Sequence, residues 1–88
     1  MKIKPEYSLQ FELDDIVIMR KNADGTETEI GPISETAAMA WEGIERNIPF
    51  DDLVDAIVTE FAGATKEAVS ADLKALMTQL VALGYAEE

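Results

Sequence analysis

The first third of the chain alternates between apolar and polar residues in the way that a half-buried β-strand requires. Every second position from residue 7 to 13 is apolar, namely Tyr7, Leu9, Phe11 and Leu13. A two-residue period of this kind predicts a strand with one buried face. The apolar run 16–19 is rich in β-branched residues and predicts a second strand.

A hairpin and a polar third strand follow. Residues 22–25 end in Asp-Gly, which is typical of a hairpin loop. The segment Thr26–Ile30 then predicts a third strand, which Gly31 and Pro32 end. Its outward residues are polar, as expected at the edge of a sheet, where backbone N–H and C=O groups lack a partner.

From residue 34 the apolar residues change to a helical period. Three faces with this spacing predict three helices, built on Ala37, Trp41 and Ile44; on Leu53, Ile57 and Phe61; and on Val69, Leu73, Leu76, Leu80 and Leu83. Ser34 and Thr65 are predicted N-caps and Gly84 a C-terminal cap residue. Trp41 is expected in the core. The prediction is a single domain, residues 1–88, of the α+β class: a three-stranded antiparallel sheet and three helices, similar to a winged helix-turn-helix.

Charge narrows the possible partners. The chain holds 18 Asp and Glu residues against 7 Lys and Arg, a net charge of −11. Such a surface repels nucleic acid and anionic membranes, because phosphate binding needs cations. No run approaches the length of a membrane span, and no apolar run follows the N-terminal lysines as in a signal peptide. With no Cys either, we expect a cytoplasmic protein.

The side chains that most catalytic sites need are missing. The chain has no His and no Cys, which excludes thiolate chemistry, His-dependent triads and the usual zinc sites. Residues 22–25 resemble part of an EF-hand, but Arg20 and Gly31 occupy positions where that loop needs acids. We therefore expect no enzyme activity, no catalytic residue, no metal and no cofactor.

Two alternatives remain open at this point. One is an acyl or peptidyl carrier protein, which is also small, acidic and helical. None of Ser8, Ser34 and Ser70 lies in the Asp-Ser-Leu type motif that carries phosphopantetheine, and a hairpin-led sheet is foreign to that fold. The other is an interaction domain, or a DNA-binding domain, of the winged-helix type.

A more specific resemblance lies in the helical half. The segment Ile33–Glu42 resembles the signature that opens the first helix of the PqqD family, with Ser34 in place of the usual Asn and Met39-Ala40 where a larger apolar residue is common. Asp51–Phe61 resembles the second helix of that family, and Ala68–Tyr85 the third helix and tail. The strands before them also fit, so the resemblance covers nearly the whole chain.

The resemblance implies a RiPP recognition element. Such proteins bind the leader of a ribosomally made precursor peptide and present it to a modifying enzyme, often a radical S-adenosylmethionine enzyme. The chain lacks the Leu-Tyr-Pro-Glu and Cys-Asp-Gly elements associated with pyrroloquinoline quinone synthesis, which favours another peptide pathway. The leader would add to the third strand by β-augmentation and place side chains in a groove beside the third helix.

The expected peptide-binding residues come from these two elements. On the third strand they are Glu27, Thr28, Glu29 and Ile30. The third helix has a second row beside its core stripe, formed by Lys66, Ser70, Lys74, Met77 and Val81. From this row and its neighbours we select Ser70, Asp72, Leu73, Lys74 and Met77. Basic ends and an apolar middle on this row would suit an acidic, apolar leader.

Overall fold

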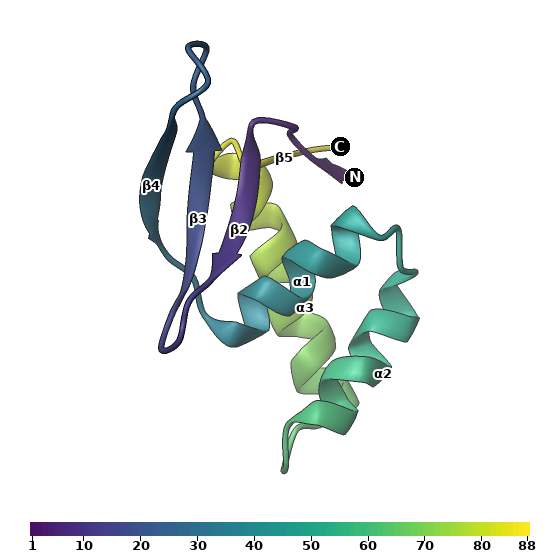
Figure 1. Ribbon diagram of the computed structural model, residues 1–88. Helices are drawn as coiled ribbons and strands as arrows, with labels where there is room; N and C mark the ends of the chain where they lie inside the picture. The colour runs from purple at the N-terminus through teal and green to yellow at the C-terminus, as the bar shows by residue number, and fades with distance from the viewer.

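The computed structural model describes residues 1–88 and has a sheet followed by three helices (Figure 1). The strands are β1 (Lys2–Ile3), β2 (Tyr7–Phe11), β3 (Ile16–Lys21), β4 (Glu27–Pro32) and β5 (Ala86–Glu87). The helices are α1 (Glu35–Glu45), α2 (Phe50–Glu60) and α3 (Lys66–Ala82). This confirms the α+β class, while the likeness to a winged helix-turn-helix is loose because the hairpin precedes the helices. No helix has the length and apolar content that crossing a bilayer would require.

The main sheet is antiparallel in the order β2-β3-β4, which leaves β4 at one edge as predicted. The strands pair with registers that include Leu9 opposite Ile18 and Arg20 opposite Thr28. The pairing of β1 with β5 was not predicted, because strands of two residues leave no periodic signal. It brings the two termini side by side (Figure 1).

Two apolar clusters hold the fold together. The sheet cluster consists of Ile18, Trp41, Ile44, Leu80 and Ala86, and joins β3 to α1 and α3. The helix cluster consists of Ala40, Leu53, Val54, Ile57, Val69 and Leu73, and joins the three helices. Trp41 has no exposed surface, which confirms its place in the core.

Local capping signals explain where the helices begin and end. Ala37 N–H donates to Ser34 Oγ over 3.1 Å, and Ala68 N–H donates to Thr65 Oγ1 over 3.3 Å. Both predicted N-caps are therefore confirmed. Gly84 follows α3 with a φ of 86°, a conformation that glycine adopts without a side-chain clash.

Three apolar residues of the predicted patterns do not enter the core. Leu13 lies beyond the end of β2 and is 98% exposed, and Phe11 at the end of that strand is 59% exposed. Leu83, expected in the buried stripe of the third helix, is 58% exposed. These expectations were wrong because the covering elements end before they reach these side chains.

The β3–β4 loop is held by side-chain hydrogen bonds. Thr26 donates to Asp24 Oδ1 through its hydroxyl over 2.6 Å and through its backbone N–H over 3.0 Å. The Thr26 hydroxyl, and after it the backbone N–H, holds the pKa of the Asp24 carboxyl below its usual value, because both stabilise the charged form. The bonds fix the turn that aligns β4 on β3.

This turn gives a prediction about pH. Thr26→Val removes the hydroxyl donor and should raise the pKa of Asp24 towards its usual value. Because the pKa is lowered in the folded state, the stabilisation is present above the unfolded-state pKa and is lost as the pH falls through the folded-state pKa. A carboxyl-carbon NMR titration of parent and variant measures this. An unchanged Asp24 pKa in the variant would show that the hydroxyl bond has no such effect.

Candidate functional site

The backbone of β4 has one edge bonded to β3 and one edge open. In an antiparallel pair, opposed residues alternate between hydrogen-bonded and non-hydrogen-bonded positions. Asn22 N–H donates to the Thr26 carbonyl over 2.8 Å, so these two form a hydrogen-bonded pair. Lys21 N–H points the other way and donates to the Glu6 carbonyl before β2 over 2.7 Å.

The register extends this alternation along β4. Lys21 faces Glu27, Arg20 faces Thr28 and Met19 faces Glu29. Thr28 is therefore a hydrogen-bonded position, whose N–H points to β3. The N–H groups of Glu27 and Glu29 point to the open edge, where an added strand would find them.

A β-bulge interrupts β4 directly after these donors. Met19 pairs with Glu29 but Ile18 pairs with Gly31, so Ile30 is an extra residue on β4. Its side chain is 38% exposed. Ile30 therefore places apolar surface beside the open donors of Glu27 and Glu29.

The opposite edge of the sheet is less open. Tyr7, on β2, also has its N–H directed away from β3, since it pairs with Arg20 at a non-hydrogen-bonded position. That N–H is already bonded to the Lys4 carbonyl over 3.1 Å. The N-terminal segment thus occupies the start of the β2 edge, whereas neither the Glu27 nor the Glu29 N–H on β4 has a backbone partner.

Two adjoining hollows follow one flank of α3. A cavity of about 150 Å³ is lined by apolar residues of α2 and α3 together with Thr36 and Asp72. A more open hollow of about 320 Å³ shares Thr36 and Asp72 and continues along Ala75, Leu76 and Gln79. We call these two hollows the α3 groove. Because Thr36 lies in the first turn of α1, just after β4, the groove is on the side of α3 where the chain enters α1 from the sheet (Figure 1).

The expected helix residues divide between the two flanks of α3. Asp72 and Leu73 line the groove, although Leu73 is 1% exposed and belongs mainly to the helix cluster. Met77 packs against both clusters and lines a hollow at the far end of α1, with Met1 and Ile48. Ser70 and Lys74 precede Met77 by seven and three residues in the same helix, and so share its flank.

The basic residues of the expected row are directed to α2. Lys66 Nζ lies 3.7 Å from Asp55 Oδ1, and Lys74 Nζ lies 5.8 Å from the centre of the Phe50 ring. The structure therefore does not place them in the α3 groove. The groove carries Asp72 instead, so its charge is negative, opposite to the charge inferred from the sequence.

Sequence reasoning missed Thr36, Ala75, Leu76 and Gln79 as groove residues. A signal was present in the leucine stripe. Leu76 and Leu83 lie at its margin, on the flank of Asp72 and Gln79, and remain half-buried and exposed respectively. An apolar stripe wider than the buried face of a helix indicates apolar surface left for another contact.

Comparisons with known proteins agree on the fold. A solved structure described as TbiB1 in complex with the TbiA(beta) leader peptide is 23% identical, with a TM-score of 0.70 over 99% of this chain and 100% of that chain. Another, lasso peptide synthetase B1 complexed with the leader peptide, is 20% identical, with a TM-score of 0.76 over 99% of this chain and 96% of that chain. No curated protein matches the chain.

The family comparison covers the elements that build the site. The model of one family, described as coenzyme PQQ synthesis protein D, matches residues 27–86. This range begins at the first residue of β4 and ends at the first residue of β5. It therefore contains the open strand edge, all three helices and the α3 groove, and it is more than half of the chain. On this evidence the chain belongs to the PqqD family.

Proposed function

We propose that this protein is a non-catalytic recognition element that binds the leader of a ribosomally made precursor peptide at the open edge of β4. The observation that carries the proposal is the pair of outward N–H groups on Glu27 and Glu29, on the strand that leads into α1, where Thr36 lines the α3 groove. Strand addition uses such donors for affinity and neighbouring side-chain pockets for specificity. Both solved structures described above hold a leader peptide, which supports this occupant.

The groove suggests the chemistry of the leader. Side chains of an added strand alternate in direction, so every second one can reach towards α3. Leu76 favours apolar side chains there and Ile30 does so on β4, while Asp72 favours a basic group or a hydrogen-bond donor. We therefore expect a leader that combines apolar residues with Lys or Arg. This replaces the acidic leader inferred from Lys66 and Lys74, which are directed to α2.

No catalytic role is included in the proposal. Asp24, whose pKa is lowered by its bonds to Thr26, lies in an exposed hairpin loop and not in a cleft. The leader would be presented to a separate modifying enzyme, for example one of the radical S-adenosylmethionine class.

Amide hydrogen exchange tests the proposed mode of binding. The probes are synthetic N-terminal segments of the short precursor peptides encoded in the source genome. The best binder should slow exchange of the Glu27 and Glu29 amides, while Thr28, already bonded to β3, changes little. A binder that protects other amides and leaves Glu27 and Glu29 unchanged would contradict strand addition at β4.

A charge placed in the groove gives a second prediction. Leu76→Glu should weaken binding of that leader by about tenfold, because it removes apolar contact and adds repulsion near Asp72. Leu13→Glu is the matched control, since it makes the same change at a fully exposed position outside the groove. Isothermal titration measures both, after thermal melting shows that each variant folds. Equal leader affinities of the two variants would exclude the α3 groove from the leader-binding site.

A further inference from the structure

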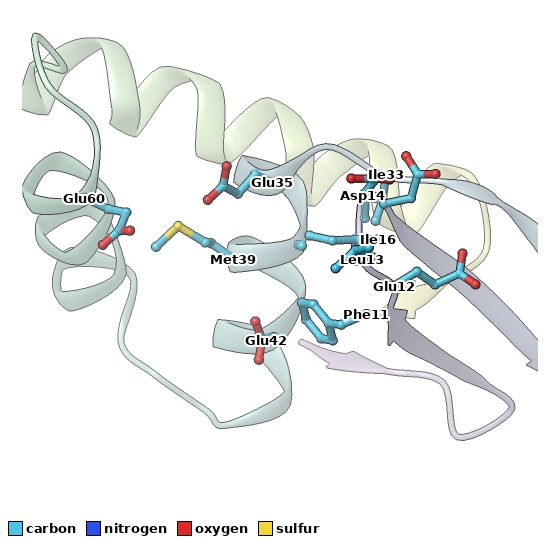
Figure 2. Close-up of a pocket in the computed structure, with 12 residues that line it drawn as sticks. Phe11, Glu12, Leu13, Asp14, Ile16, Ile33, Glu35, Met39, Glu42 and Glu60 are labelled. Carbon is cyan, nitrogen blue, oxygen red and sulfur yellow. The ribbon is translucent and has the colours of Figure 1, made fainter.

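A large hollow lies outside the β4 edge and the α3 groove. It has a volume of about 530 Å³ and lies between the β2–β3 turn, the start of α1 and the end of α2. Its apolar part comprises Phe11, Leu13, Ile16, Ile33, Ala38 and Met39. We call it the turn pocket. Figure 2 shows Phe11, Leu13 and Ile16 near one another on the sheet side, and Met39 directed from α1 towards Glu60.

Two apolar residues of the turn pocket are unusually open to solvent. Leu13 is 98% exposed and Phe11 is 59% exposed, the two highest values among the large apolar side chains of the chain. Neither contributes to either core cluster. Exposed apolar side chains gathered in one hollow, with polar groups around them, mark a contact surface.

The rim of the turn pocket is acidic and has no basic residue. The acids that line it are Glu12, Asp14, Asp15, Glu35, Glu42 and Glu60. Figure 2 shows Glu35 and Glu42 on either side of Met39, with Glu60 facing it from α2 and Glu12 and Asp14 beside Leu13. Only Glu42 has an ion-pair partner, Arg46 at 3.5 Å. The remaining carboxylates lack a neutralising neighbour.

The distribution of these carboxylates selects the kind of partner. They encircle the apolar middle and do not converge into any group that could hold a metal ion. A second copy of the chain would bring two acidic rims together, and its net charge of −11 opposes that contact. A polypeptide surface with an apolar side chain surrounded by Lys and Arg complements both the middle and the rim.

We infer that the turn pocket is the docking surface for a basic, apolar segment of the modifying enzyme that receives the leader. The inference rests on the proposed function, since it supplies the second contact that presentation of a leader requires. Phe11 and Leu13 precede residue 27, where the match to the family begins, so this contact uses a part of the chain separate from the β4 edge. Leader and enzyme would then bind at the same time.

Selection of peptides tests the inference without knowledge of the enzyme. Random displayed peptides are selected on the parent protein and counter-selected on the double variant Phe11→Ser, Leu13→Ser. Since both side chains are exposed, the variant should fold, which circular dichroism checks. We expect enrichment of peptides that combine Arg or Lys with apolar residues. Their affinity should fall about tenfold or more in the variant, because the apolar contact is lost.

Two double variants distinguish the effect of the rim carboxylates on peptide binding from the effect of the net charge of the protein. The double variant Glu35→Gln, Glu60→Gln should weaken binding of the selected peptide severalfold at low salt. Added salt should reduce the difference in affinity between parent and variant. Asp51→Asn with Asp52→Asn removes the same charge from the start of α2, outside the pocket, and should have a smaller effect. Equal effects of the two pairs, or enrichment of peptides without basic residues, would overturn the inference.

The outcome is independent of leader binding. Protection of the Glu27 and Glu29 amides by the leader should be unchanged in the Phe11→Ser, Leu13→Ser variant. If no leader protects these amides in the parent, the proposed function fails while the pocket peptide can still bind. Two results would reject the docking surface and leave the proposal of leader binding intact. One is that no peptide is enriched. The other is that the selected peptide shifts the NMR signals of residues 27–30 and not those around Met39.

Discussion

Trp41→Ala should lower the free energy of unfolding by about 3–5 kcal/mol, a large share of the roughly 5–15 kcal/mol typical of a domain. The indole is fully buried in the sheet cluster, between the sheet and α3. Its ring centre lies 5.9 Å from that of Tyr85, which itself makes an edge contact at 5.0 Å with Tyr7. Removal of the indole would leave a cavity where three elements meet.

The matched control is Trp41→Phe. It keeps most of the ring and removes the indole Nε1–H, which is buried without a hydrogen-bond partner. An unpaired buried donor is itself unfavourable, so this variant should lose less than half of what the alanine variant loses. Urea unfolding is followed by circular dichroism, because Trp41 is the only tryptophan. A parent-like alanine variant that has lost leader binding would place Trp41 in the peptide site.

The parts of the fold that were predictable rest on local chemistry. Ser34 and Thr65 cap helices because their hydroxyls reach N–H groups three residues ahead, which depends on almost nothing else. The Asp24-Gly25 turn and the polar edge strand follow from similarly short-range rules. These local features predict the order of the elements and the position of β4 at an edge of the sheet, and the structure confirms both predictions.

The extent of burial could not be predicted in the same way. Alternation from residue 7 to 13 predicts a strand face but does not say how far the helices extend beneath it. Leu13 lies beyond that cover, and Leu83 lies beyond the cover of the third helix. The sequence pattern assigned Leu13 and Leu83 to the core, but both side chains form apolar surface that is available to a partner.

The side of α3 that forms the groove was also beyond sequence reasoning. Two rows of residues flank its buried stripe, one with Lys74 and Met77 and one with Asp72 and Leu76. Both rows mix apolar and charged residues, as is usual beside the buried face of an amphipathic helix. The choice between them depends on how α1 crosses α3. The start of α1, with Thr36, lies beside Asp72, whereas its end, with Ile44, lies beside Met77. Only the tertiary arrangement places the start of α1, which follows β4 in the chain, on the Asp72 side.

Two proline substitutions on neighbouring residues of β4 should have opposite effects. Proline removes a backbone donor and is tolerated at a strand edge when that donor faces outward. Glu29→Pro removes an outward N–H, so the hairpin should stay folded while leader affinity falls by about tenfold or more. Thr28→Pro removes an N–H directed at β3, so it should lower the free energy of unfolding by about 1–3 kcal/mol.

Side-chain effects are removed by two controls, Glu29→Ala and Thr28→Val. The second matters because the Thr28 hydroxyl accepts a hydrogen bond from Asn22 Nδ2 over 2.8 Å. Urea unfolding and leader titration of all four variants give the comparison. Glu29→Ala should keep more leader affinity than Glu29→Pro, and Thr28→Val should keep more stability than Thr28→Pro. Each control retains the backbone donor that proline removes. If Glu29→Pro folds and binds the leader as Glu29→Ala does, the Glu29 N–H takes no part in binding. The leader would then not be an added strand on β4, even if the α3 groove still contributes.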